Sequence, residues 1–489
     1  MNRHTLQKIF LPMMVLSFFC SHSYAQIDSI FKKDSLDHSM FIYKDLKIRD
    51  TVSSLDSFKV RKAPVREKKF LRAGIEWFIA QAAPASFNYF ITKDPYSHIS
   101  FKNFINHQRL SAWFWDDNEF TTNQIDHPIH GYLYFNAFRS NGYNLWQSSL
   151  ATFAGSYIWE TGGETQQPAV NDLVNTTLGG ILLGEMTHRV ARNILGRSRN
   201  GRNKTGNEIT AFLVNPVNGL NRWLDGKFAH VDEYNAVDSS TITGAIDVGA
   251  RRFDARSGDL LNKGKTSYSV RLRFNYANGQ HNFNRPFDQF SVNLEMGKGD
   301  STFINAVNVH AMLYGNEFLD TKRGSYYGIL SGHYDFYNND AFFYGAQSLN
   351  YSLLSEYYYK KSSLKLNVAG GALLLAAVPD PYLLYGDSRN YNYGSGLSYR
   401  FDGELNVQKR LILNGSYNGA TFFTISGNDS HYSLNALNLE ASFRFFKQFS
   451  ISATGGYFFL HGNFEDPELE DFEREYPFAR LAIGYSILF

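Results

Sequence analysis

The chain ends on residues 479–489, which read ARLAIGYSILF. Successive side chains of an extended strand point to opposite faces, so every second residue lies on the same side. One face of this stretch is apolar, and it consists of Leu481, Ile483, Tyr485, Ile487 and Phe489. The opposite positions hold Arg480, Ala482, Gly484 and Ser486. This alternation is typical of a strand that faces lipid on one side and a polar lumen on the other.

The same two-residue period recurs through the second half of the chain. Alternating segments occupy residues 268–276, 290–296, 307–313, 437–445 and 449–457, with turn-forming clusters between neighbouring segments. Their polar positions hold Arg, Asn and Glu, which would be costly in a dry core but are tolerated by a water-filled lumen. We therefore predict a mainly β protein, in which residues 240–489 form a transmembrane antiparallel β-barrel of about twelve strands.

Composition agrees with strands that alternate between lipid and water. Aromatic residues make up 16% of the chain, with 31 Tyr and 42 Phe, yet the mean hydropathy is −0.33. After the first 25 residues, no apolar run approaches the roughly 18 residues of a membrane helix. Two of the 48 basic residues lie in that first segment, and the remaining 46 balance the 46 acidic ones. The charge balance argues against a nucleic-acid partner, which would favour a basic protein.

The amino terminus predicts export. Residues 1–25 combine a basic start, an apolar stretch and the small-residue cleavage motif Ser23-Tyr24-Ala25, which together indicate a signal peptide. A lipoprotein signal using Cys20 is the alternative, but Phe18 and Phe19 precede it where small residues are needed. The final Phe489 resembles the C-terminal signal of bacterial outer-membrane barrels. We therefore predict an outer-membrane location, with membrane lipid and the barrel-assembly machinery as partners.

The first half of the chain has a different character. Residues 26–66 are polar and lack a sustained period, which indicates an extended periplasmic lead, and residues 67–239 form a predicted helical block. Helices are expected over 67–83 and 173–195. Gly179, Gly180 and Gly184 in the second helix each cost about 1 kcal/mol relative to alanine, which makes sense if another backbone packs close by. Because these helices are short and polar, we expect them to plug the barrel, underlie it or lie on the inner leaflet.

Residues 127–195 form the most specific part of the block. The segment resembles a Gram-negative outer-membrane family of unknown function, domain of unknown function 3943. The resemblance spans about seventy residues in order and includes a set of polar residues and a glycine pair, namely His127, His130, Arg139, Glu160, Glu164, Asn171, Asp172, Gly179, Gly180, Glu185 and Arg189. It implies a helical block followed by a C-terminal barrel in the outer membrane, and it implies no activity.

These polar residues raise the hypothesis of a divalent-metal site. Glu185 and His188 stand three residues apart on one helix face, as in carboxylate-bridged two-metal bundles, and His127 and His130 repeat the spacing. Glu160 would be a further ligand. However, a two-metal bundle needs the Glu-x-x-His unit twice, and this block contains it once. The alternative is structural: Glu185, His188 and Arg192 form a charged face, while Glu160 and Glu164 pair with Arg139. We therefore predict no cofactor, with a divalent metal as the alternative.

Two functional hypotheses remain. The favoured one is a non-enzymatic outer-membrane barrel with a helical plug or brace, which serves envelope integrity or restricted passage of a solute or lipid. The rival is an enzyme that acts on lipid or lipopolysaccharide through catalytic Glu164, Asp172, Glu185 and His188. No Gly-x-Ser-x-Gly elbow surrounds Ser148 or Ser149, so no serine is marked as a nucleophile. A weaker third hypothesis is membership of a larger secretion or uptake complex.

Overall fold

The computed structural model describes residues 67–98, 100–196, 204–230, 240–277, 285–298, 302–383 and 389–488. The predicted signal peptide, the periplasmic lead and Phe489 lie outside these residues. Within them the chain forms two compact units. The helical unit comprises residues 67–116 and 121–230, and the barrel unit comprises Asp117–Phe120 together with everything from Ser240 onward.

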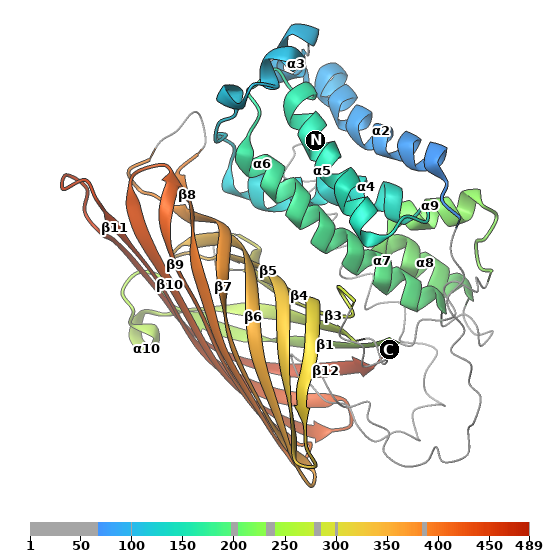
Figure 1. Ribbon diagram of the computed structural model, residues 1–489. Helices are drawn as coiled ribbons and strands as arrows, with labels where there is room; N and C mark the ends of the chain where they lie inside the picture. Colours follow the sequence, from blue (N-terminus) through green and yellow to red (C-terminus); the bar gives the residue numbers. More distant parts are fainter. Residues whose placement is uncertain are drawn as a thin grey trace. The chain divides into compact units, whose positions relative to one another are not determined.

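The barrel unit is a closed cylinder of antiparallel strands (Figure 1). Twelve strands pair in chain order, and β1 closes the barrel against β12. The strands are β1 (Thr241–Phe253), β2 (Lys265–Ala277), β3 (Gln289–Gly297), β4 (Ile304–Asp320), β5 (Gly324–Asn338), β6 (Phe343–Tyr359), β7 (Ser362–Pro379), β8 (Tyr391–Val407), β9 (Leu411–Ser426), β10 (Ser430–Phe446), β11 (Phe449–Phe464) and β12 (Phe472–Leu488). A four-residue helix, α10 (Leu260–Lys263), lies between β1 and β2. The predicted fold, a barrel of twelve strands preceded by a helical block, is confirmed.

Side-chain alternation explains why these segments form barrel strands. On β12, Leu481 and Ile483 point outward and are 65% and 58% exposed, whereas Arg480 and Ala482 point inward and are buried. The connections at the end where β12 finishes are mostly short, as between β10 and β11, where Lys447 adopts a positive φ. Such a turn matches the twist of the strands it joins. The long 341–359 stretch, which sequence alone left as one strand or two, forms the single strand β6.

The helical unit is built from eight α-helices and several shorter turns within the described residues. The α-helices are α2 (Phe70–Phe87), α3 (Phe101–His107), α4 (His127–Arg139), α5 (Leu145–Gly162), α6 (Val170–Val174), α7 (Gly180–Gly196), α8 (Lys204–Val214) and α9 (Pro216–Leu224), with α6 lasting little more than one turn. Short 3₁₀ turns are η3 (Pro95–Ser97) and η4 (Leu110–Ala112), and π turns are η2 (Asn88–Thr92), η5 (Thr122–Asp126) and η6 (Asn175–Gly179). Among the helices in the described part of the chain, none combines the length and apolar character that crossing a bilayer requires.

The predicted helix over 173–195 is interrupted. It consists of α6, the π turn η6 and α7 in direct succession. The interruption lies where α4 crosses this segment: a Cβ atom on Gly131 would come within 1.8 Å of the Thr176 carbonyl oxygen, and one on Gly180 within 2.4 Å of the Gly131 backbone. The prediction that these glycines admit a neighbouring backbone is therefore confirmed for Gly180.

Candidate functional site

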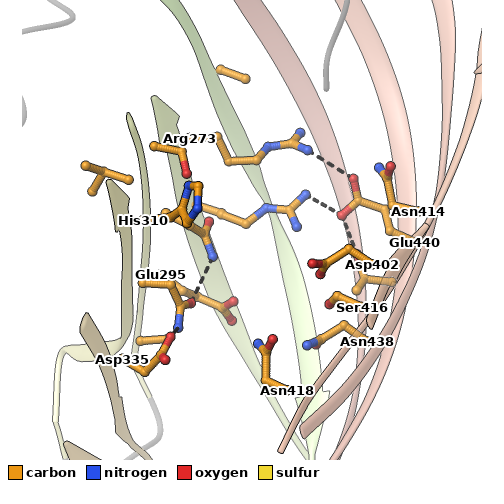
Figure 2. A pocket seen from close by; sticks show the side chains of 18 of the residues that line it. Arg273, Glu295, His310, Asp335, Asp402, Asn414, Ser416, Asn418, Asn438 and Glu440 are labelled. Atoms are coloured by element: carbon orange, nitrogen blue, oxygen red, sulfur yellow. Dashed lines mark hydrogen bonds and ion pairs between the residues drawn. The ribbon is translucent and has the colours of Figure 1, made fainter. Parts of the chain in front are cut away.

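The barrel encloses a polar cavity of about 200 Å³. Every residue that lines it lies between Thr243 and Ile487, so strands of the barrel itself form its wall. Six basic and five acidic side chains line the cavity, together with many asparagines. Figure 2 shows Arg273 reaching toward Glu440, with Glu295, His310 and Asp335 on the opposite side from Asp402. Such a lining offers donors and acceptors of both signs to a polar solute.

Two ion-pair clusters organise the charged wall. In the first, Arg271 and Arg273 on β2 contact both Asp247 on β1 and Glu440 on β10, and the Arg271 Nη2 to Glu440 Oε2 distance is 2.5 Å. In the second, Glu295 on β3 accepts hydrogen bonds from Arg251 at 3.0 Å and from Arg480 at 2.6 Å. Every one of these charges has an opposite partner, which offsets part of the cost of removing it from bulk water.

A third cluster lies around Asp335 on β5. Its carboxylate contacts Arg400 on β8 and accepts a hydrogen bond from Asn308 Nδ2 at 2.9 Å. Arg400 also donates to Asn418 Oδ1 at 3.1 Å. Charges and amides from four different strands therefore meet at this level of the lumen.

Aromatic side chains fill the lumen beyond the cavity, toward the end opposite the strand termini at Thr241 and Leu488. They belong to a buried apolar cluster that includes Phe253, Tyr337, Phe342, Tyr344, Phe422, Tyr432, Phe458, Phe472, Tyr476 and Phe478. Tyr337 on β5 and Phe458 on β11 come from strands that are diametrically opposite in a twelve-stranded barrel. Their ring centroids are nevertheless only 5.1 Å apart. The two rings therefore meet across the lumen and narrow it at this level.

A smaller apolar cluster faces the lumen nearer the other end. It consists of Met312, Tyr327, Ile329 and Leu354, all less than 3% exposed. The charged cavity thus has apolar side chains on both sides along the barrel axis. The polar level of the lumen therefore lies between two levels that are lined mainly by apolar side chains.

The site residues predicted in the helical unit separate into distinct networks. Glu185 is fully buried and binds Arg139 through Nε at 2.6 Å and Arg189 through Nε at 2.8 Å. Burial by itself would raise the pKa of Glu185, but the two guanidinium groups outweigh it and hold that pKa far below its usual range. His188 is buried on the same helix, and it also favours the ionised form of Glu185. Arg139 therefore forms its ion pair with Glu185, and not with Glu160 and Glu164 as predicted.

Asp172 belongs to a second network. Its Oδ1 lies 3.2 Å from His127 Nε2 and accepts a hydrogen bond from Asn171 Nδ2, which also donates to Asp116. Burial and then the Asp116 charge raise the pKa of Asp172 well above its usual range. Burial lowers the pKa of His127 to about 4. At neutral pH His127 is therefore uncharged, and the shifts favour a protonated Asp172.

Glu160, Glu164 and His130 lie elsewhere. Glu160 Oε2 accepts the Ala169 backbone N–H at 2.9 Å, and Glu164 Oε1 accepts the Trp159 indole N–H at 3.0 Å. Burial and then the Glu164 charge raise the pKa of Glu160 well above its usual range. His130 Nε2 lies 3.0 Å from the Ala80 carbonyl oxygen, and burial lowers its pKa to about 4.

The proposed metal ligands are therefore held by different partners. Over the residues that the structure describes, no three His, Cys, Asp or Glu side chains are grouped as metal ligands would be. The catalytic and metal-binding roles of the five ligand candidates and of Glu164 and Asp172 remain predictions.

Sequence reasoning did not single out the lumen residues as a site. Arg271, Arg273, Glu295 and Arg480 were recognisable as polar positions on alternating strands, which was the available signal. What the alternation does not show is which of these charges meet, because their partners lie up to 185 residues away in the chain.

Comparison with known proteins supports the architecture. Residues 112–217 match the family model described as Domain of unknown function (DUF3943), which confirms the predicted resemblance. No curated protein matches the chain.

Solved structures resemble the barrel at low identity. A TodX deltaS2 mutant monoaromatic hydrocarbon channel shares 9% identity at a TM-score of 0.24, covering 52% of this chain and 91% of that one. The KdgM porin shares 13% at 0.23, covering 50% and 99%. The NanC porin shares 10% at 0.26, covering 48% and 98%. At these identities the likeness is to the barrel fold alone.

Proposed function

We propose that this chain, in which a domain of unknown function 3943 precedes a closed barrel, is an outer-membrane protein that restricts the passage of a small polar solute. The outward aliphatic and aromatic residues of the strands, such as Leu397, Leu439 and Ile451, are each more than half exposed and suit contact with lipid. The helical block acts as a brace or plug in this proposal, and the assembly machinery recognises the last strand.

The contact between Tyr337 and Phe458 carries the proposal. A solute moving along the lumen has to pass the level at which these two rings meet from opposite walls. In the neighbouring cavity, the charged and amide side chains can form the hydrogen bonds that a polar solute otherwise makes with water. Six basic against five acidic lining residues leave little net charge, which suits a neutral or zwitterionic solute better than a strongly charged one.

Conductance tests the closure. The double variant Tyr337→Ala/Phe458→Ala is expected to raise single-channel conductance several-fold over the intact protein, because the lumen loses the two rings that bridge it. The matched control is Tyr351→Ala, which removes an aromatic ring from the outer surface of β6, where it is 55% exposed. An intact protein that already conducts steadily at the level of the double variant would contradict restricted passage. A double variant that stays closed would show that the contact of these two rings does not set the restriction.

One observation favours the rival enzyme. Asp172 and Glu160 are buried carboxyl groups with raised pKa values, and strongly perturbed groups of this kind cluster at active sites. His127 lies beside Asp172 at hydrogen-bonding distance. A protonated carboxyl group beside a neutral imidazole has the parts needed for proton transfer to a lipid substrate.

The isosteric variant Asp172→Asn tests the enzyme. If the rival is correct, mass spectrometry of envelope lipids is expected to show accumulation of an unmodified lipid, and elemental analysis of the purified wild type shows bound transition metal if a metal takes part. An unchanged lipid profile in cells that hold normal amounts of the variant would count against catalysis at Asp172.

A further inference from the structure

The helical unit buries many polar side chains and exposes many apolar ones. Its interior contains an unusual number of amide, hydroxyl and charged side chains, among them Asn123, Asn136, Thr152, Glu160, Asn171, Asp172, Glu185, Asn215 and Asn221, all less than 9% exposed. A water-soluble helical domain normally places such groups on its surface and apolar ones in its core. The unit also has a buried apolar core, for example Phe135, Val190 and Ile194, but the apolar side chains left on its surface point to an apolar environment there.

The surface of α2 is apolar along its length. Phe70, Leu71 and Phe78 are 72%, 76% and 64% exposed, and Ile75 and Ile79 are more than half exposed. We call these five residues, together with Trp146, Leu150 and Phe153 of α5, the apolar surface.

The charged residues of α2 do not interrupt the apolar surface. Arg72 and Glu76 are the only charged residues from Phe70 to the end of η2 at Thr92. Both face the rest of the unit: Arg72 Nη1 donates to Asp225 Oδ1 at 2.8 Å, and Glu76 Oε2 accepts from Asn141 Nδ2 at 2.7 Å. The outward side of this helix therefore carries no exposed charge.

The neighbouring helix α5 repeats the pattern. Trp146, Leu150 and Phe153 follow one another at helical spacing, and they are 70%, 68% and 45% exposed. The only charged residue of α5 is the buried Glu160. Hydrogen bonds from Trp77 Nε1 to the Ala151 carbonyl oxygen and from Gln81 Nε2 to that of Gly155 hold α2 and α5 together. From residue 121 to 196, no charged residue is exposed.

The exposed charges that flank these helices are mainly basic. Between residues 67 and 110, the described residues include four exposed cations, Lys68, Lys93, Lys102 and Arg109, and one exposed anion, Glu67. Lys68 precedes α2, and Lys93 directly follows η2, so basic residues stand at both ends of the apolar segment. Lipid phosphate groups complement this charge, and tryptophan such as Trp146 favours the boundary between acyl chains and headgroups.

We propose that the apolar surface of α2 and α5 lies against the acyl chains of a phospholipid leaflet, with the flanking lysines at the lipid phosphates. The unit does not span the bilayer in this arrangement but lies in its interface, as monotopic helices do. Lipid then covers the exposed aromatic and aliphatic side chains, whose exposure to water would otherwise be unfavourable in proportion to their area.

Tryptophan fluorescence tests the proposal directly. All six Trp residues lie between positions 77 and 223, in the helical part of the chain, and none lies in the barrel strands. The full-length protein is reconstituted into phosphatidylcholine and phosphatidylglycerol vesicles whose acyl chains carry bromine, a quencher confined to the membrane. The emission of Trp146 is obtained as the difference between the wild type and Trp146→Phe. We expect brominated lipid to quench most of this emission and aqueous acrylamide to quench little of it.

The matched control is Trp159→Phe, because the Trp159 ring is only 7% exposed and donates to Glu164. Its difference emission is expected to respond weakly to either quencher. Quenching of Trp146 by acrylamide but not by brominated lipid would place the apolar surface in water and overturn the proposal. Protection of Trp146 from both quenchers would overturn it as well, since a protein surface, either the barrel or a second copy of the chain, would then cover α5.

Discussion

Replacing Glu185 with alanine is expected to destabilise the helical unit by about 3–5 kcal/mol, the typical cost of removing one partner from a buried ion pair. Glu185 is fully buried, and it accepts hydrogen bonds from Arg139 and Arg189. The variant leaves both guanidinium groups without this carboxylate in an environment that disfavours isolated charge. Tryptophan fluorescence of the detergent-solubilised protein during urea unfolding measures the effect, because every Trp reports on the helical part.

Two control variants show whether the effect depends on the burial of Glu185 and on its charge. Glu67→Ala removes an exposed carboxylate and is expected to change the unfolding free energy by less than about 0.5 kcal/mol. Glu185→Gln keeps the acceptor oxygen but loses the charge, so we expect a cost between the other two. A stable Glu185→Ala protein that has lost bound metal would instead support the predicted metal site.

The pH dependence of the Glu185 contribution follows from its lowered pKa. A carboxyl group with a lower pKa in the folded state stabilises the fold above the pKa of the unfolded chain, about 4.3, and loses that contribution as the pH falls through the folded value. The difference in unfolding free energy between the wild type and Glu185→Gln should therefore stay constant at neutral pH and shrink only in strong acid. A difference that disappears near pH 6 would contradict the ion-pair assignment.

Replacing Glu295 with alanine is expected to have the largest effect on the barrel, also about 3–5 kcal/mol. Glu295 is the shared partner of Arg251 and Arg480, with distances of 3.0 and 2.6 Å. Both arginines are less than 5% exposed, so water reaches them poorly once the carboxylate is gone. The measurement is the urea concentration at which the purified barrel loses its heat-dependent mobility shift on gel electrophoresis.

A double variant sharpens the test of this ion pair. Glu295→Ala/Arg480→Ala removes one of the two stranded cations and is expected to be less destabilised than the sum of the single variants. The control is Glu470→Ala, which removes an exposed loop carboxylate and should leave the transition unchanged. Additive single effects would mean that Glu295 and Arg480 do not interact energetically.

The barrel was predictable because its cause is local. Alternation of apolar and polar residues, as in Leu481 and Ile483 on either side of Ala482, forces any closed sheet to place one set outward and the other inward. The approximate number of strands and the closeness of Gly180 to another backbone were also predicted from local sequence features. The family resemblance over residues 127–195 supplied the helical block ahead of the barrel.

Only the tertiary structure determines which side chains from distant parts of the sequence contact each other. Arg139 lies opposite Glu185 rather than Glu160, and Tyr337 meets Phe458 across the lumen, because strand tilt and helix crossing set which positions share a level. Periodicity assigns a residue to a face, but it carries no information about depth along the barrel or about rotation of one helix on another. The sequence alone therefore determined which strand residues face the lumen. Tertiary packing decided that aromatic rings meet across the lumen and that the polar residues of the helical unit form separate networks.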